Sequence, residues 1–175
     1  DLRTPDKPGY AMAEAADVIA LMGPQIERIK QLGVTALVEC TTIGVGRRAD
    51  IDLAVSLAAD FPIVVPTGSY REPWITDFVA GASEKALEDW MGRELAERFD
   101  EADVRAGWIK ISAGDDGISA TEERILRAAA DFIRAAAGEG FGRAKGSGFL
   151  TLPHLSCCAR LSSPRWGEGK TGRIF

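Results

Sequence analysis

The chain has 175 residues, of which 46% are hydrophobic and 27% are charged, and its formal net charge is −5. This balance is typical of one globular domain and excludes a collagen-like, disulfide-rich or largely disordered chain. No apolar run reaches the roughly 18 residues that a membrane-spanning helix needs, and the acidic balance disfavours nucleic acid as the main partner. The odd count of three Cys favours a reducing compartment. We therefore expect a cytoplasmic protein with no membrane partner and no nucleic-acid partner.

Helix and strand patterns alternate along residues 1–137. In chain order they predict a helix over Ala11–Leu32, a strand over Val34–Cys40, a helix over Asp50–Asp60, a strand over Ile63–Thr67, a helix over Ser83–Phe99, a strand over Gly107–Ser112 and a last helix that begins after Ser119. Gly23–Pro24 predicts an interruption of the first helix, and Gly33 predicts its end. Ser119 and Glu122 predict a capping box, because each side chain can bond the other residue's free backbone N–H.

Two of the predicted helices carry apolar residues at helical spacing along one face. These residues are Leu87, Trp90, Met91, Leu95 and Phe99 in the earlier helix, and Ile125, Ala128, Ala129, Phe132, Ile133 and Ala136 in the last helix. Because such a face is buried against a sheet or another helix, we expect these residues to lie in the core.

Strands that alternate with helices predict an α/β fold with a parallel sheet and right-handed crossovers. Two architectures fit this order, an open doubly wound sheet and a (β/α) barrel. Three strands cannot close a barrel, which needs eight, so the chain is either a small open sheet or part of a barrel. Both architectures place chemistry at the carboxyl ends of the strands. Those ends are Cys40–Arg48, Thr67–Ala82 and Ser112–Ile118.

The composition changes near Gly138. Residues 1–137 hold 15 Lys and Arg against 24 Asp and Glu, whereas residues 138–175 hold 6 against 2 and also contain 8 of the 19 Gly. Phe149–Leu152 is the strand candidate in this basic, Gly-rich tail. Its cluster of His154, Cys157 and Cys158 falls short of the four ligands of a closed zinc site. Because the tail has no periodicity, we expect it to be disordered or to arise from a shifted reading frame.

Gly44-Val-Gly46-Arg-Arg-Ala49 fits the G-x-G-x-x-A pattern that holds a pyrophosphate between a strand and a helix. The context fits less well, because three residues separate Cys40 from Gly44 where that pattern needs an immediate turn. The next predicted strand also lacks the acidic residue that binds a ribose hydroxyl. A plain turn is therefore favoured over a dinucleotide site.

Lys110 lies in a short apolar strand, where Ile109 and Ile111 point to the opposite face. A lysine in such a strand costs free energy unless it is paired or loses its charge. It could act as a nucleophile, a base or an amine that captures CO₂ as a carbamate, or it could simply extend to solvent. Tyr70 and Trp74, in the long loop after the second strand, could line a pocket or pack that loop against the sheet.

Four segments together, by their order and spacing, resemble the phosphotriesterase-like family of the amidohydrolase superfamily. They are Leu32–Arg47, Ile63–Tyr70, Val104–Ile111 and Glu122–Ala130. The family pattern joins a strand that ends in an acidic residue and a Gly-Arg turn, a strand that ends in Thr-Gly plus an aromatic residue, and a strand reading Arg/Lys-Ala-Gly-x-Ile-Lys. The resemblance implies that residues 1–137 are part of a (β/α)8 TIM barrel, about strands 2 to 4, and that residues 138–175 are a separate tail.

The resemblance also implies a hydrolase in which two divalent ions, with zinc expected, activate a bridging hydroxide that attacks a phosphotriester, lactone or other ester. It places Lys110 at the family's carboxylated lysine, which bridges both ions, and Tyr70 at an aromatic substrate-binding position. It implies no catalytic residue beyond the metal site. The family's His-x-His pair is not matched, so we expect an incomplete copy that binds metal poorly and is weak or inactive as this chain.

Two alternatives stay open beside a hydrolase of small esters or lactones, whose barrel would also be compatible with a homodimer. The chain could be a non-catalytic remnant that folds only with a partner, because part of a barrel leaves both edge strands unpaired. It could also be a small nucleotide-binding α/β domain that uses Gly44–Ala49. A full set of metal ligands would favour the hydrolase over both alternatives.

Overall fold

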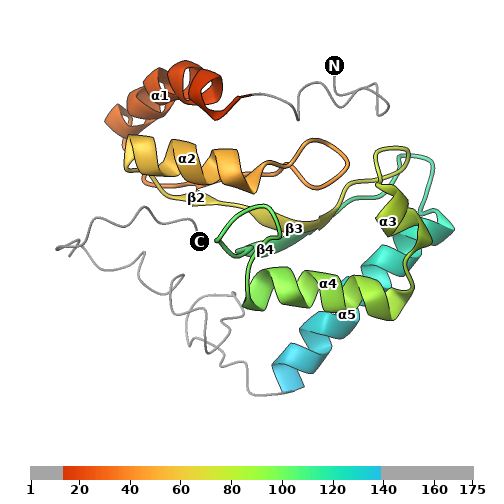
Figure 1. Ribbon diagram of the computed structural model, residues 1–175. Coiled ribbons are helices and arrows are strands. Elements are labelled where there is room, and N and C mark those ends of the chain that lie inside the picture. Colours follow the sequence, from red (N-terminus) through yellow and green to blue (C-terminus); the bar gives the residue numbers. More distant parts are fainter. Residues whose placement is uncertain (1–13, 139–175) are drawn as a thin grey trace.

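The computed structural model describes residues 14–138 (Figure 1). The predictions made for the tail, which include the strand over Phe149–Leu152 and the cluster of His154, Cys157 and Cys158, lie outside the described residues. None of the helices within 14–138 is long and apolar enough to cross a membrane.

Helices and strands alternate within this range as the sequence predicts. In chain order the elements are α1 (Ala15–Gln31), β1 (Leu37–Val38), α2 (Ala49–Ala59), β2 (Ile63–Val64), β3 (Pro66–Ser69), α3 (Asp77–Gly81), α4 (Glu84–Ala96), β4 (Trp108–Ile111) and α5 (Ala120–Gly138). The predicted second strand is thus present as two short strands, β2 and β3, which are separated by one residue.

The strands form two parallel pairs, and they follow one another in chain order. β2 pairs with β1, whereas β3 pairs with β4. The carbonyl oxygen of Val65, between β2 and β3, accepts a hydrogen bond from the Gly107 N–H at 2.9 Å. Beyond β1 the chain touches the sheet again through a parallel bridge between Ile43 and Ser69. The second predicted strand therefore lies between the first and the third, which is the strand order of a barrel wall.

Two pairs of helices flank the strands. α1 packs against α2, and α4 packs against α5. Figure 1 shows the first pair on one side of the strands and the second pair on the other side in this view. This pairing gives the described part of the chain two buried clusters rather than one.

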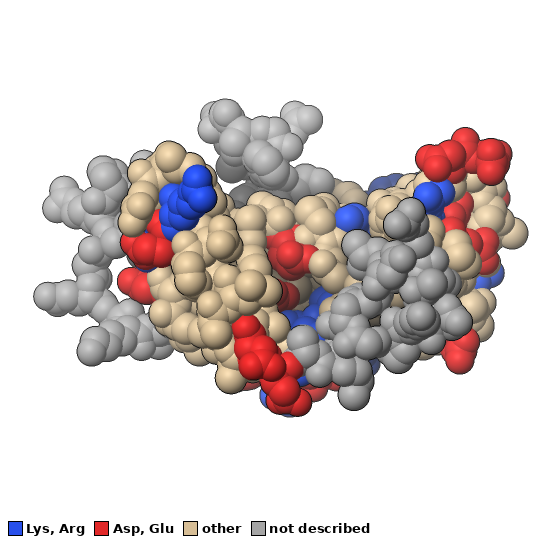
Figure 2. Space-filling view, turned by 90° about the horizontal axis from the view of Figure 1, so that it is seen from above, with Lys and Arg blue, Asp and Glu red and all other residues tan. Residues whose placement is uncertain are grey.

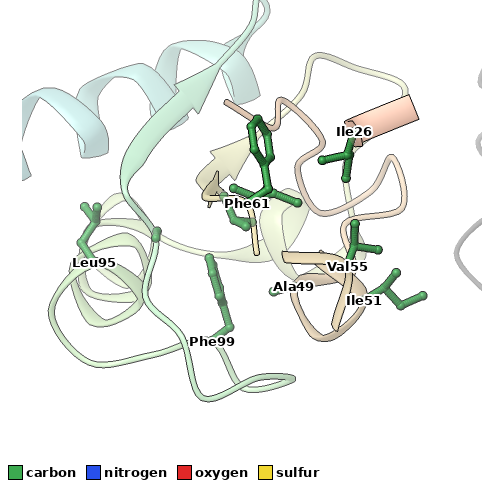
Figure 3. Packing of buried hydrophobic residues seen from close by; sticks show 10 residues of the cluster. Ile26, Ala49, Ile51, Val55, Phe61, Leu95 and Phe99 are labelled. Carbon is green, nitrogen blue, oxygen red and sulfur yellow. The ribbon is translucent and has the colours of Figure 1, made fainter. Parts of the chain in front are cut away.

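The first buried cluster joins the strands to α1 and α2 and also takes in Leu95 of α4, whereas the second lies between the strands and the helices α3, α4 and α5. One contains Ile26, Ala49, Ile51, Val55, Phe61, Ile63, Val65, Leu95, Phe99 and Ala106 (Figure 3). The other contains Val79, Leu87, Trp90, Met91, Ile125, Ala128 and Ala129. The predicted core face of α4 is therefore confirmed, as is most of the face predicted for α5. Ile133 is the exception: it is 41% exposed.

The ends of the helices show which local signals the fold follows. Ser119 Oγ accepts the Glu122 N–H at 3.1 Å, and the Glu122 carboxylate accepts the Ser119 N–H at 3.0 Å, so the predicted capping box forms. Gly33 has a φ of 88° just after α1, as expected for the residue that ends a helix. The predicted interruption at Pro24 is wrong, because α1 runs through it.

The loop predicted over Thr67–Ala82 contains a helix that the sequence reasoning missed. α3 begins after Thr76, whose Oγ1 accepts the Val79 N–H at 3.3 Å. A helix of five residues is too short to show an apolar period. Its Val79 is fully buried in the second cluster, so packing fixes this helix.

Candidate functional site

Lys110 lies within β4, on the face of the strand that is turned away from the helices. Its neighbours Ile109 and Ile111 pack against the buried clusters, and alternate residues of a strand point to opposite faces. The alternation predicted from the sequence is thus confirmed for these two residues. It leaves Lys110, which is half-buried, on the other face of the sheet.

Residues that follow β1 and β3 lie close to the amine of Lys110, which is in β4. Its Nζ donates a hydrogen bond to the Cys40 carbonyl oxygen, beyond β1, at 2.7 Å. The same nitrogen lies 5.4 Å from the centre of the Tyr70 ring, which follows β3 and is within the range of a cation–π contact. The structure therefore brings together Lys110 and Tyr70, which the sequence reasoning selected separately. Their roles as metal ligand and substrate contact stay predictions.

Gly68 lets β3 approach β4 closely beside Lys110, its partner in the strand register. Gly68 has a φ of 96°, and a Cβ built on it would lie 2.1 Å from the Lys110 carbonyl oxygen. A side chain at this position would both strain the backbone and push the strands apart. The glycine of the Thr-Gly-aromatic pattern is thus required by the backbone that positions Lys110.

Aromatic and basic side chains stack in the loop after β3. The rings of Tyr70 and Trp74 lie 5.8 Å apart and are tilted by 55°. The Arg71 guanidinium lies 5.4 Å from the centre of the Trp74 ring and pairs with Asp115, beyond β4, at 3.2 Å. The loop that carries Tyr70 is therefore tied to the loop that follows Lys110.

A second tie between these two loops comes from Glu122, in the first turn of α5. Its Oε1 accepts the Glu72 N–H at 3.1 Å, and its Oε2 accepts the Gly114 N–H at 3.2 Å in addition to the capping bond from Ser119. Glu122 is 5% exposed. The backbone N–H groups of Ser119, Gly114 and Glu72, helped by the Arg71 charge, hold the pKa of Glu122 below its usual value. The sequence predicted the cap but not the two loop contacts.

A buried ion pair, which the sequence reasoning missed, joins the turn after β1 to α4. The Arg47 guanidinium bonds Glu94 through two nitrogens, at 2.9 and 2.7 Å, and also bonds Glu101 at 3.0 Å. The Trp90 indole N–H donates to Glu94 at 2.9 Å, and the Phe99 ring lies 4.3 Å from the guanidinium. One available signal was Glu94 itself, a carboxylate among the core residues of α4, because a buried charge needs a partner.

Asp52, in the first turn of α2, has an unusual protonation equilibrium. Burial, together with the charges of Glu39 and Asp50, raises the pKa of Asp52 to about 7, and Arg47 opposes the shift. A carboxyl group that titrates near neutrality is more common at functional sites than elsewhere. Asp50 and Asp52 nevertheless both lie in the first turn of α2, beyond the turn that follows β1.

The glycines of the G-x-G-x-x-A segment form a turn. Gly44 and Gly46 have φ values of 84° and 96°. A Cβ at Gly44 would lie 2.3 Å from the Trp74 carbonyl oxygen, so protein backbone fills the space beside this glycine. The close approach that Gly44 permits is therefore to the loop after β3, and the favoured interpretation of this segment as a turn agrees with the structure.

The donor atoms near Lys110 do not by themselves make a metal centre. Within residues 14–138, no three His, Cys, Asp or Glu side chains lie together in a group that could hold a metal ion. Figure 2 shows acidic and basic side chains scattered over the described part of one face of the molecule. Towards a metal centre, the described part of the chain thus supplies the Lys110 amine and the residues around it, but not a full set of ligands.

Comparisons with known proteins give a consistent match. The sequence pattern of the Phosphotriesterase family matches residues 6–140. The aryldialkylphosphatase of Saccharolobus solfataricus is 28% identical over 106 residues, which is 61% of this chain and 34% of that protein. A phosphotriesterase homology protein of Mycobacterium tuberculosis is 27% identical over 133 residues, which is 72% of this chain and 40% of that protein.

A solved structure agrees with these sequence matches. A mutant of a PTE-like lactonase from Deinococcus radiodurans superposes with a TM-score of 0.65 and 26% identity, covering 71% of this chain and 41% of that structure. The chain thus spans less than half of the length of each of these relatives.

Proposed function

Because the chain belongs to the phosphotriesterase family, we propose that it forms part of the site of a metal-dependent hydrolase that acts on small phosphotriesters, lactones or related esters. Its fold is part of a (β/α)8 TIM barrel, and sites in such barrels form at the carboxyl ends of the strands. One observation carries the proposal: Lys110 and Tyr70, from neighbouring strands, meet at this end of the sheet. The named relatives include an aryldialkylphosphatase and a lactonase, which supports this range of substrates.

Lys110 is the metal ligand in this proposal. When a neutral lysine amine adds CO₂, an N–C bond forms, one proton is released and the product is a carbamate whose single negative charge is shared by two oxygens. Oxygen donors of this kind suit divalent cations. The Cys40 carbonyl holds Nζ at the strand ends, 2.7 Å away, and Gly68 keeps the backbone of β3 close behind it. The chain therefore positions the amine before any ion binds.

The proposed ions are two divalent cations, with zinc first among them, and such a pair supplies a hydroxide at neutral pH. The described residues fit this pair only in part, since no group of three metal-binding side chains lies together within 14–138. The other ligands must then come from outside these residues. The described part alone is expected to bind zinc poorly and to hydrolyse little.

Tyr70 is the substrate contact in this proposal. Its ring is half-buried, packs on Trp74 and faces the Lys110 amine. An aromatic face of this kind binds the aryl or alkyl groups of an ester through apolar contact. Tyr70 thus orients the substrate.

The test uses the full chain, loaded with zinc in bicarbonate buffer. Zinc content and hydrolysis of a p-nitrophenyl dialkyl phosphate and of an aliphatic lactone are measured for the wild type and for Lys110→Met. A matched control is Lys30→Met, because Lys30 Nζ also donates to a backbone carbonyl, that of Ala59 at 2.9 Å, but on α1. We expect Lys110→Met to reduce bound zinc and any hydrolysis at least tenfold, and Lys30→Met to change neither.

A carbamate gives a direct second measurement. With ¹³C-labelled bicarbonate, NMR should show a carbamate carbon in the wild type that is absent in Lys110→Met. Hydrolysis that persists without metal, or zinc that stays bound in Lys110→Met, would contradict the proposal. A chain that unfolds cooperatively but neither binds zinc nor hydrolyses either substrate would instead favour the non-catalytic alternative.

A further inference from the structure

Glu122 makes more hydrogen bonds than a helix cap requires. In a capping box the Glu carboxylate has to accept one hydrogen bond, from the N-cap backbone N–H. Here the Glu122 carboxylate accepts that bond from the Ser119 N–H at 3.0 Å. The same carboxylate also accepts the Glu72 N–H at 3.1 Å and the Gly114 N–H at 3.2 Å. These two amides belong to different loops, and Glu72 is 50 residues away along the chain. The two additional contacts therefore serve something other than the helix.

The two loops that Glu122 joins are those that flank Lys110. Glu72 follows Tyr70 by two residues in the loop after β3, and Gly114 lies in the loop after β4, the strand that carries Lys110. Each oxygen has its own task, because Oε1 holds the first loop and Oε2 holds the second loop and the cap. Charge-assisted hydrogen bonds to a carboxylate are stronger than neutral ones. The spacing between the loops is thus set by the width of one carboxylate.

The other contact between these loops is weaker. The Arg71–Asp115 pair, at 3.2 Å, is exposed on the acid's side, where the Asp115 side chain is 90% accessible. Exposed ion pairs of this kind contribute little. Glu122, by contrast, is 5% exposed, so water competes little for its oxygens. The buried carboxylate is therefore the main tie between the two loops.

We propose that Glu122 is a positioning residue, which fixes the Tyr70 loop relative to the Lys110 strand by holding the Glu72 and Gly114 amides on one carboxylate. The part that concerns substrate rests on the proposed function, because it takes Tyr70 as the substrate contact. The part that concerns the loops stands on the hydrogen bonds alone. The two parts are tested by different measurements.

The first measurement is amide hydrogen exchange in the full chain, with four variants. Glu122→Ala removes all three contacts, and Glu122→Gln keeps one acceptor oxygen and the size of the side chain. Ser119→Ala removes the Ser119 half of the cap but leaves the carboxylate. Glu123→Gln is the matched control, because Glu123 is the next residue, is exposed and pairs with Arg127 on the same helix.

We expect Glu122→Ala to accelerate exchange at the Glu72 and Gly114 amides at least tenfold, and Glu122→Gln to accelerate one of them by several-fold. Ser119→Ala and Glu123→Gln should leave both amides within twofold of the wild type. The chain has two Tyr, Tyr10 and Tyr70, so selective labelling also reports the Tyr70 ring. Its NMR signals should shift and broaden in the two Glu122 variants.

Neither readout needs a metal or a substrate, so a failure of the proposed function leaves this test intact. Unchanged exchange at Glu72 and Gly114 in Glu122→Gln and Glu122→Ala would overturn the proposal, as would equal acceleration by Ser119→Ala. If Glu122→Ala does not fold, Glu122→Gln against Glu123→Gln decides the question. Where the chain does hydrolyse the p-nitrophenyl dialkyl phosphate, Glu122→Gln should raise KM by several-fold with a smaller change in kcat.

Discussion

Two buried carboxylates join distant parts of this chain, and they are neutralised in different ways. Glu94 is 3% exposed and Glu122 is 5% exposed. Glu94 faces the Arg47 guanidinium and an indole N–H, so a positive charge balances it. Glu122 is bonded to backbone N–H groups of Ser119, Gly114 and Glu72, so peptide dipoles balance it. The first arrangement resists local change because both partners are charged, whereas the second can be loosened one amide at a time.

The two carboxylates also lie in different parts of the molecule, and one of them lies beside the candidate site. The Arg47–Glu94 pair lies between the turn after β1 and α4, where it closes the first buried cluster beside Phe99. The Glu122 contacts lie at the strand ends that hold Tyr70 and Lys110. The ion pair thus joins two parts of the scaffold, whereas the amide contacts of Glu122 lie beside the candidate site.

The largest predicted effect is at the ion pair. Glu94→Gln leaves the buried Arg47 charge with Glu101 as its remaining acid partner, and we expect a loss of about 3 kcal/mol in the free energy of unfolding, measured by urea denaturation. The double variant Arg47→Met with Glu94→Leu removes both charges and should recover most of that loss. A double variant as unstable as Glu94→Gln would show that hydrogen-bond geometry, rather than the buried charge, dominates this region.

The second prediction separates the cap from the loop contacts of Glu122. Ser119→Ala should cost about 1 kcal/mol, the usual value of a helix cap. Glu122→Ala loses the two loop bonds as well, and these are hydrogen bonds to a charged group, so we expect about 2–3 kcal/mol. Equal losses in the two variants, measured by denaturation at neutral pH, would mean that the loop contacts do not contribute to stability.

Glu122 should also contribute to the loss of stability at acidic pH. The pKa of Glu122 is lower in the folded chain than its usual value of 4.5, so its contribution is complete above that pH. It is lost as the pH falls below 4.5 through the lowered pKa. The wild type should therefore lose stability there more steeply than Glu122→Gln, in denaturation curves that are compared at matched salt.

Local patterns in the sequence predicted what depends on neighbours within a few residues. The capping box of Ser119, the core face of α4 and the face of β4 that carries Lys110 all follow from spacing along one element. The partners of Glu94 and Glu122 could not be predicted in this way, because Arg47 and Glu72 lie 47 and 50 residues away. Those pairs depend on how the elements pack, which no local period encodes.

The same distinction explains the errors. Pro24 predicts an interruption on local grounds, but the packing of α1 against α2 continues through it. Ile133 lies at the edge of the predicted core face of α5 and is 41% exposed, whereas Ala136, nearer the end of the helix, is buried. The convergence of Lys110 with Tyr70 was implied by the carboxyl-end rule for parallel strands, although the hydrogen bond to the Cys40 carbonyl was not.

Asp52 is a third carboxylate that extends this comparison. Its charge is fully balanced neither by an ion pair, as in Glu94, nor by backbone N–H groups, as in Glu122. Burial, with the charges of Glu39 and Asp50, raises its pKa to about 7. A raised acid pKa means that the folded state holds a proton that the unfolded state has released, so stability should fall as the pH rises from about 4 to about 7. Asp52→Asn should remove this slope and stabilise the protein by about 1–2 kcal/mol at pH 8. Denaturation at pH 5 and pH 8 measures it, and a slope that persists in Asp52→Asn would assign the titration to another group.

The smallest predicted effect is at the Arg71–Asp115 pair, which spans the same two loops as Glu122. Asp115→Asn should change the free energy of unfolding by less than about 0.5 kcal/mol, because the acid is 90% accessible and salt screens the pair. At high salt the wild type and Asp115→Asn should have the same free energy of unfolding, whereas the destabilisation by Glu122→Ala should remain. If Asp115→Asn instead destabilises as much as Glu122→Ala, the loops are held by surface charge. The contrast between Glu94, which is balanced by a charged partner, and Glu122, which holds the loops through backbone N–H groups, would then be wrong for the loops around the candidate site.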